Sequence, residues 1–193
     1  MQLENTFWFW NNAVGNKFCD DVIRFSKTLQ KQKGVVIDSD GSGLLNTKTR
    51  KSEIIWMNEK WIYKELLTYI TEANKLANYN FNLKEAEAIQ YTRYSNNNYY
   101  DWHIDQIKNN NSKLERKLSI IINLTDPNDF EGGDVWVSNP HPESDKTQKI
   151  KLDFMRRRGS CVVFPSFVYH RVAPITKGTR HSLVCWMKGE RFQ

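Results

Sequence analysis

The chain lacks long apolar runs. No stretch of its 193 residues reaches the length of about 18 apolar residues that a membrane-spanning helix requires. The opening segment, MQLENTFWFWNNAVGNKF, has an early acidic residue, no basic n-region and no long apolar h-region, so it does not resemble a secretory signal. We therefore expect a cytoplasmic protein with no membrane partner.

Cysteine and histidine are both scarce. The three cysteines, Cys19, Cys161 and Cys185, form no CxxC pair and are odd in number, which argues against a disulfide framework and against a zinc knuckle. They are expected to be small core residues. With only four histidines in the chain, the placement of each one is informative.

Apolar and charged residues, by contrast, are present in the proportions of a globular protein. The chain is 39% hydrophobic and 13% aromatic, and its length suits one domain with a sizeable core. The net charge of +6 leaves nucleic acid or acidic partners open. Because the basic residues are scattered rather than striped, a soluble basic protein without a nucleic-acid partner is the preferred interpretation.

Two N-terminal segments have the apolar periodicity of amphipathic helices. The first follows Asn16 and the second follows Asn58, and residues 38–52 between them are expected to form a loop with a short extended piece. In each helix the apolar residues recur at the spacing of one face. These residues are Phe18, Val22, Phe25 and Leu29 in the first helix and Ile62, Leu66, Tyr69, Ala73 and Leu76 in the second.

From about residue 86 the periodicity changes from helical to strand-like. Turn-forming clusters separate eight segments, which is the number of strands in a jelly roll. We expect strands over residues 87–94, 98–104, 117–124, 133–138, 148–154, 160–165, 167–175 and 180–188. The polar loop around Asn109, Asn110 and Asn111 is a candidate lid, because it directly follows the second of these strands.

Helices followed by an unbroken series of strands predict an α+β fold that is mainly β. The expected core is a double-stranded β-helix (jelly-roll, cupin-like), with an N-terminal helical layer packed on one sheet. We expect a single domain over residues 1–193, in which residues 1–85 supply the helices and residues 86–189 form the jelly-roll core.

A candidate metal site begins in the segment NYYDWHIDQIK, residues 98–108. On a strand, His103 and Asp105 project to the same face. Taken alone, this pair more often has a structural role. His170, in a late apolar strand, would supply a third ligand if the two strands converge in a jelly roll. Two histidines and one carboxylate are typical of non-haem Fe(II) oxygenases, although a zinc-dependent hydrolase also uses such a set.

A candidate carboxylate clamp follows the last of these histidines. Arg180 and Ser182 share one face of the strand RHSLVCWMK. A guanidinium group holds a carboxylate with two charge-assisted hydrogen bonds, and a hydroxyl two residues on adds a third. A surface arginine after the turn TKGT is the alternative for Arg180 alone, but its offset from His170 favours the clamp.

Three segments together resemble a known family. The run HID, the segment LSIIINLTDPNDFEGGDVWV and the tract GSCVVFPSFVYHRVAPITKGTRHSLVCWMKG look like the 2-oxoglutarate- and Fe(II)-dependent dioxygenases of the prolyl-hydroxylase superfamily. Within it, they are similar to the bacterial PKHD-type hydroxylases. The resemblance covers roughly residues 86 to 189, and the motifs stand in the family's order and at its offsets.

The resemblance implies roles for individual residues. His103, Asp105 and His170 match the metal ligands, and Arg180, with Ser182 assisting, matches the basic residue that pairs with the distal carboxylate of 2-oxoglutarate. Two further positions match cofactor-binding residues more loosely. Tyr94 falls near a tyrosine that lines the co-substrate pocket, and Asn123 stands where some relatives have a pocket-lining side chain, with a structural role at the strand end as the alternative.

The resemblance also implies the chemistry. The cofactor is Fe(II), the co-substrates are 2-oxoglutarate and O2, and ascorbate is a candidate reductant. Because Asp105 is present, where halogenating relatives have a small residue, hydroxylation of an unactivated C–H bond is expected. A protein or peptide is the expected substrate, with a prolyl residue as the leading candidate. The aromatic residues Tyr99, Tyr100, Trp102 and Trp136 line a groove for such a chain or else belong to the core.

Two alternatives stay open. Dioxygenases that oxidise nucleic-acid bases share the metal ligands, but their RxNxTxR pattern is absent from RHSLVCWMKGER. A non-catalytic, cupin-like binding module would keep the barrel without iron, and it is disfavoured because the triad and the clamp are both complete. The sequence does not determine the oligomeric state.

Overall fold

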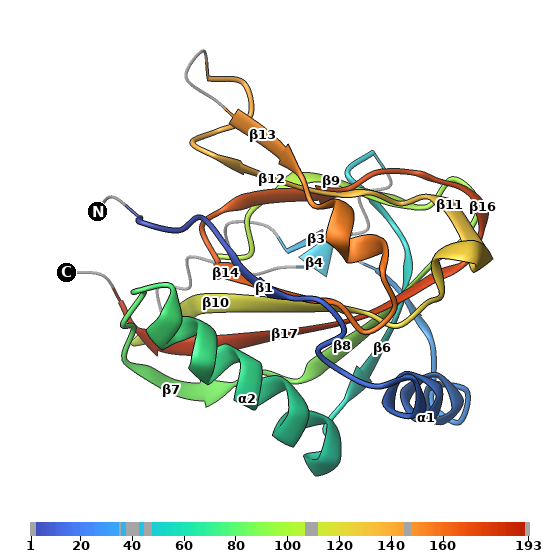
Figure 1. Ribbon diagram of the computed structural model, residues 1–193, viewed down its shortest axis with the longest axis horizontal. Coiled ribbons are helices and arrows are strands. Elements are labelled where there is room, and N and C mark those ends of the chain that lie inside the picture. Colours follow the sequence, from blue (N-terminus) through green and yellow to red (C-terminus); the bar gives the residue numbers. More distant parts are fainter. Residues whose placement is uncertain are drawn as a thin grey trace.

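The computed structural model describes residues 3–34, 36–37, 43–44, 48–106, 112–144 and 148–191 (Figure 1). Its helices are α1 (Asn16–Ser26) and α2 (Lys60–Leu76), with short 3-10 turns η1 (Pro127–Asp129) and η2 (Asp153–Arg156). The strands of the N-terminal half are β1 (Trp8–Trp10), β2 (Gln32–Lys33), β3 (Val36–Ile37), β4 (Gly43–Leu44), β5 (Arg50–Lys51), β6 (Glu53–Met57), β7 (Leu83–Ala86) and β8 (Ile89–Tyr94). The remaining strands are β9 (Tyr99–His103), β10 (Leu114–Asn123), β11 (Phe130–Gly132), β12 (Val135–Asn139), β13 (Gln148–Lys151), β14 (Cys161–Pro165), β15 (Tyr169–Val172), β16 (Ile175–Gly178) and β17 (Arg180–Glu190).

Two antiparallel sheets form the body of the molecule. The larger runs in the order β1-β14-β10-β17-β8-β6-β2, with β7 also paired to β17, and the smaller runs β13-β12-β15-β9-β5. Figure 1 shows the smaller sheet on one side of the larger sheet and both helices on the other. The mainly β fold with a helical layer is therefore confirmed.

The helices form because one face of each is apolar and finds a partner in the larger sheet. In α2, Ile62, Leu66 and Ile70 are fully buried and join the cluster that includes Ile120 and Leu183 of the sheet. Burying each such side chain contributes about 1.5 to 3 kcal/mol. The two predicted helices are confirmed, with α1 beginning at Asn16 itself. Two residues of the predicted helix faces differ: Leu29 lies beyond the end of α1 at Ser26, and Leu76, the last residue of α2, is exposed.

Strand β10 separates the two halves of the core. Ile120 and Ile122 face the helices, whereas Ile121, between them, packs with Val162 and Phe164 in a second cluster that includes Val137 of the smaller sheet. The period-two alternation of a strand explains this division. A strand buried on both faces appears in the sequence as a continuous apolar run, which is how SIIIN was found.

All eight predicted strands are present, but further strands occur: the N-terminal half adds several, and β11 pairs with β16, which begins at Ile175 and runs into the predicted turn TKGT. Strand β6 pairs with β8 in the larger sheet, and β5 pairs with β9 in the smaller sheet. The N-terminal segment therefore contributes to both sheets as well as supplying helices. Its strands are too short to show a periodicity in the sequence.

The candidate lid at Asn109 to Asn111 lies outside the described residues. The three cysteines are free and buried, as expected. Among the described residues, no helix has the length and apolar character to cross a membrane.

Candidate metal centre and co-substrate pocket

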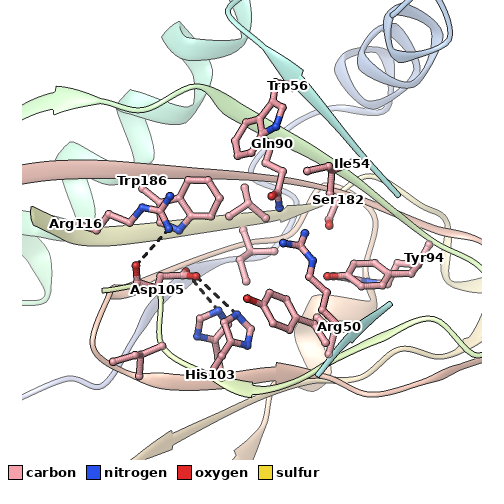
Figure 2. Close-up of a pocket in the computed structure, with 17 residues that line it drawn as sticks. Arg50, Ile54, Trp56, Gln90, Tyr94, His103, Asp105, Arg116, Ser182 and Trp186 are labelled. Carbon is pink, nitrogen blue, oxygen red and sulfur yellow. Dashed lines mark hydrogen bonds and ion pairs between the residues drawn. The ribbon is translucent and has the colours of Figure 1, made fainter. Parts of the chain in front are cut away.

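Strands β9 and β15 bring two histidines side by side in the smaller sheet. His103 and His170 are register partners, and their rings lie 4.1 Å apart between centroids. Asp105 follows the end of β9, and its carboxylate turns toward both rings. Its Oδ1 lies 3.7 Å from Nε2 of His103 and its Oδ2 lies 3.4 Å from Nε2 of His170, as the dashed lines in Figure 2 show. One nitrogen or oxygen from each residue lies within 4.8 Å of the others.

Backbone carbonyls fix the orientation of both imidazoles. Nδ1 of His103 lies 2.7 Å from the carbonyl oxygen of Asp101, and Nδ1 of His170 lies 3.1 Å from that of Val168. A carbonyl can only accept a hydrogen bond, so each Nδ1 carries the proton and each Nε2 keeps its lone pair. Both lone pairs are thus available on the side where the Asp105 carboxylate lies, which is the usual arrangement for histidine ligands of a metal.

The charges at this site suit a divalent cation. Burial, together with the repulsion that two protonated imidazoles would have at this distance, lowers the pKa of His103 well below its usual range, so His103 is neutral at neutral pH. Burial would raise the pKa of Asp105, but His170, His103 and Arg116 outweigh it and hold this pKa at about 2. Oδ2 of Asp105 is buried and accepts no hydrogen bond from the described residues. A buried carboxylate oxygen without a donor is stabilised by a cation.

Arg116 supports the position of Asp105. Its Nη1 donates a hydrogen bond of 3.3 Å to the main-chain carbonyl of Asp105, while Nε and Nη2 bind both carboxylate oxygens of Glu87 at 2.9 and 2.6 Å. The guanidinium group also lies 3.9 Å above the ring of Trp186. This bidentate pair fixes Arg116 in one geometry, so the backbone that carries the carboxylate is held from the side of the larger sheet.

A cavity of about 80 Å³ lies between the sheets, with the His103–Asp105–His170 group in its wall. Arg180 and Ser182 of β17 line the same cavity, as does Tyr94, the register partner of Arg180 on β8. Arg180 is only 1% exposed, and neither Nη1 nor Nη2 has a hydrogen-bond partner among the residues that the structure describes. Burial lowers the pKa of Arg180 to about 10, so the guanidinium stays charged at neutral pH. A buried cation with free donors requires an anionic ligand.

Asn123 is the one predicted site residue that the structure does not bring to this cavity. It lies at the end of β10, fully buried, and its Nδ2 donates to the carbonyl oxygens of Thr125, Arg156 and Arg157. These bonds tie the end of the strand to the turn after η2. The geometry around Asn123 is that of the structural alternative at a strand end.

The wall of the cavity contains further residues that the sequence analysis missed. On β17 every second residue from Arg180 to Trp186 faces the cavity, so alternation alone could have found the C-terminal ones. Alternation could not have identified Arg50, because its strand has only two residues and is too short to show a period. The missed residues are Arg50, Ile54, Trp56, Gln90, Ile104, Arg116, Ile121, Val172, Val184 and Trp186.

Of the four aromatic residues considered for a substrate groove, Tyr100 lines the cavity, whereas Tyr99, Trp102 and Trp136 do not. Tyr100 stacks on the ring of His103 at 3.4 Å between centroids. Trp102 and Trp136 instead flank Arg171, whose guanidinium lies 5.1 and 5.4 Å from their ring centres. Arg171 alternates with the inward-facing His170, so this cluster lies on the opposite face of the smaller sheet.

Comparison with solved structures agrees with this arrangement. A viral collagen prolyl hydroxylase from Paramecium bursaria Chlorella virus-1, solved with 2OG, superposes with a TM-score of 0.67 at 18% identity, covering 96% of this chain and 97% of that one. A Pseudomonas putida prolyl-4-hydroxylase gives 0.68 at 16% identity, covering 98% and 95%. A prolyl hydroxylase from Trichoplax adhaerens, in complex with a hypoxia inducible factor peptide fragment, gives 0.66 at 18% identity, covering 95% and 84%. At these identities the similarity shows a shared fold.

Sequence relatives give the family. A PKHD-type hydroxylase of Alteromonas mediterranea is 32% identical over 102 residues, which is 51% of this chain and 42% of that protein. A PKHD-type hydroxylase of Gloeothece citriformis is 31% identical over 105 residues, 54% of this chain and 44% of that protein. The matches thus span under half the length of these relatives. The family model of the 2OG-Fe(II) oxygenase superfamily matches residues 89–188, more than half of the chain, so the chain belongs to that superfamily.

Proposed function

We propose that this protein is an Fe(II)- and 2-oxoglutarate-dependent hydroxylase that acts on an unactivated C–H bond of a protein or peptide, with a prolyl residue as the leading target. Its core would be a double-stranded β-helix, and residues 1–193 would form one domain. The observation that carries this proposal is the buried guanidinium of Arg180, without a partner among the described residues, in the same cavity as two histidines and a carboxylate.

His103, Asp105 and His170 would hold Fe(II). They offer two nitrogen donors and one carboxylate, a set that leaves open positions on the metal for a co-substrate and for O2. When bound, the iron supplies the oxidative chemistry, driven by decarboxylation of 2-oxoglutarate, and ascorbate would serve as the reductant. The protein orients the ligands, through the carbonyls that bind each Nδ1 and through the bond from Arg116 to Asp105.

Arg180 would bind the distal carboxylate of 2-oxoglutarate, and Ser182 and Tyr94 would complete this end of the pocket. All three side chains are at least 96% buried and lie on neighbouring strands of the larger sheet, opposite the metal ligands on the smaller sheet (Figure 2). A five-carbon dicarboxylate would therefore bridge the two sheets, with one end at the metal. Because Arg180 is buried, each charge-assisted hydrogen bond to its guanidinium is stronger than it would be in solvent.

The mouth of the cavity supports a substrate with an apolar contact surface. Trp56 and Ile104 line the cavity and are 38% and 37% exposed, which is unusual for large apolar residues in this chain. An extended peptide would place an apolar side chain against them. The fold relatives named as prolyl hydroxylases, one of them solved with a peptide fragment, support the same substrate class.

The test is succinate release from 2-oxoglutarate by anaerobically purified protein, supplied with Fe(II) and ascorbate and then exposed to air. Turnover should occur in the wild type and be lost in Arg180→Ala, Asp105→Ala and His170→Ala. Arg24→Ala is a matched control, because Arg24 is an exposed arginine on α1. Turnover in Asp105→Ala or His170→Ala equal to that of the wild type would refute the metal assignment.

The alternatives predict different outcomes. If the protein were a zinc-dependent hydrolase or a binding module, 2-oxoglutarate should not be turned over and should not bind specifically, since neither function gives Arg180 a role. A nucleic-acid oxidase would bind single-stranded or duplex DNA with a steep salt dependence. Turnover with 2-oxoglutarate, together with peptide binding that does not depend on salt, would exclude all three.

A further inference from the structure

A second cavity, of about 180 Å³, lies between α1 and the outer face of the larger sheet. We call it the α1 cavity. Ile23 of α1 and Ile55 and Tyr91 of the sheet form apolar parts of its wall, and Ser26 and His181 add polar groups. Tyr91 and His181 are joined by a hydrogen bond of 2.6 Å between the phenol oxygen and Nδ1, and their rings stack at 5.5 Å.

Cations surround the α1 cavity. Among the residues that the structure describes, Lys27, Lys31 and Arg93 line it, against one carboxylate, Glu53, which already accepts a hydrogen bond of 2.6 Å from Arg93. Neither lysine forms an ion pair with a carboxylate in the part of the chain that the structure describes. The nearby Asp20 of α1 is bound to Arg158. The cavity therefore has an excess of positive charge over an apolar wall.

The imidazole of His181 responds to this charge. Burial, together with the positive charges of Arg93, Lys27, Arg180 and Lys31, lowers its pKa to about 4. His181 is therefore neutral at neutral pH. An anion in the cavity would relieve the repulsion among these cations, and a second cation would increase it.

The α1 cavity is distinct from the pocket between the sheets. His181 stands between Arg180 and Ser182 on β17, and successive side chains of a strand point to opposite faces. No described residue lines both cavities. A ligand of the α1 cavity would thus lie behind the strand that carries the proposed carboxylate clamp, separated from the metal ligands by the sheet.

We propose that the α1 cavity binds a small organic carboxylate with a compact apolar body. The body would pack on Ile23, Ile55 and Tyr91, and the carboxylate would bind at the rim formed by Lys27 and Lys31. Ligand sites are mostly apolar with a few well-placed polar groups, and this wall has that composition. Benzoate, a single-ring acid, combines such an apolar body with one carboxylate. This inference does not rest on the proposed function.

The test is calorimetric titration with benzoate at constant ionic strength, with benzyl alcohol as the neutral match and inorganic phosphate as a small anion without an apolar body. The variants are Lys27→Gln/Lys31→Gln and, as a control with the same change of charge, Lys64→Gln/Lys75→Gln on exposed positions of α2. Arg180→Met serves as a third variant, because benzoate is also a carboxylate.

Benzoate should bind the wild type, the α2 control and Arg180→Met alike, and about tenfold more weakly to Lys27→Gln/Lys31→Gln, since two favourable charges are lost. Benzyl alcohol and phosphate should bind far more weakly than benzoate. The proposal is overturned if the wild type does not bind benzoate, if the loss appears in Arg180→Met instead, or if phosphate binds as well as benzoate. None of these outcomes bears on succinate release, so the two proposals fail separately.

Discussion

Replacing Arg180 by methionine should stabilise the ligand-free protein while abolishing its response to 2-oxoglutarate. Burial lowers the pKa of Arg180 well below the ordinary value of an arginine, to about 10, and the difference corresponds to about 3 kcal/mol of unfavourable burial. Methionine removes this cost but leaves some volume unfilled, which costs about 1 kcal/mol. The net gain of about 2 kcal/mol should raise Tm by about 4 to 8 °C for a chain of this length.

The assay is thermal unfolding with and without 2-oxoglutarate, in the presence of Zn(II), which accepts the same nitrogen and oxygen ligands as Fe(II) without redox chemistry. At a concentration 100 times its Kd, 2-oxoglutarate should stabilise the wild type by about 2.7 kcal/mol, and it should not change the Tm of Arg180→Met. Arg24→Met controls for the loss of one positive charge, since the Arg24 side chain is 76% exposed.

A result that refutes this reasoning is easily recognised. If Arg180→Met unfolds at a lower temperature than the wild type and still responds to 2-oxoglutarate, then the guanidinium has a structural partner and no role in co-substrate binding. A lower Tm together with a lost response would show that the free energy of burial is overestimated. A higher Tm without ligand, together with a lost response to 2-oxoglutarate, identifies a ligand-binding arginine, because the loss of a structural arginine would lower Tm.

Three further predictions concern the scaffold. Arg116→Met should lower the free energy of unfolding, measured by urea titration, by about 3 kcal/mol, because it leaves the carboxylate of Glu87 without its partner. The double variant Arg116→Met/Glu87→Gln should recover part of this loss, and a loss as large as that of Arg116→Met alone would contradict the pairing. In the same titrations, Leu66→Ala should lower the free energy of unfolding by about 2 to 5 kcal/mol and Leu76→Ala by less than about 0.5 kcal/mol, since of these two residues only Leu66 is buried. Similar losses in the two variants would contradict the packing of α2 on the sheet. The folded pKa of His181 is about 4, below the ordinary histidine value of about 6.5, so its neutral form stabilises the fold above pH 6.5, and that contribution should be lost as the pH falls from 6.5 to 4. His181→Gln should flatten this part of the pH profile of Tm, and an unchanged profile would show that His181 titrates normally.

Strong periodicity made the core strands and helices predictable. Ile62 and Leu66 recur on one helix face, and the run around Ile121 is long enough to be a strand buried on both sides. The metal ligands were predicted from residue types that bind metals, two of which stand two positions apart, the spacing of one face of a strand. The structure brings His103, Asp105 and His170 together. Their role as iron ligands stays a prediction.

Other parts depend on pairing that no local pattern contains. Strand β5, which brings Arg50 to the cavity, has two residues and takes its extended form from pairing with β9. Asn123 lies on a predicted strand, yet its environment is set by the carbonyls of Arg156 and Arg157, far along the chain. Propensity and alternation describe a residue's own segment, so they could not show which turn would meet this amide.

Strand β17 explains why one cavity was foreseen and the other was not. Alternation puts Arg180 and Ser182 on one face and His181 on the other, and this much follows from the sequence. What lies on each face is decided by the layers: the smaller sheet covers the inner face, and α1 approaches the outer face near Tyr91 (Figure 1). Lys27 caps the end of α1 and Lys31 follows the helix, so both come near His181 because α1 ends there. A lysine just past a helix is ordinarily a solvated surface charge, and only the packing of α1 on the sheet makes these two lysines part of a cavity.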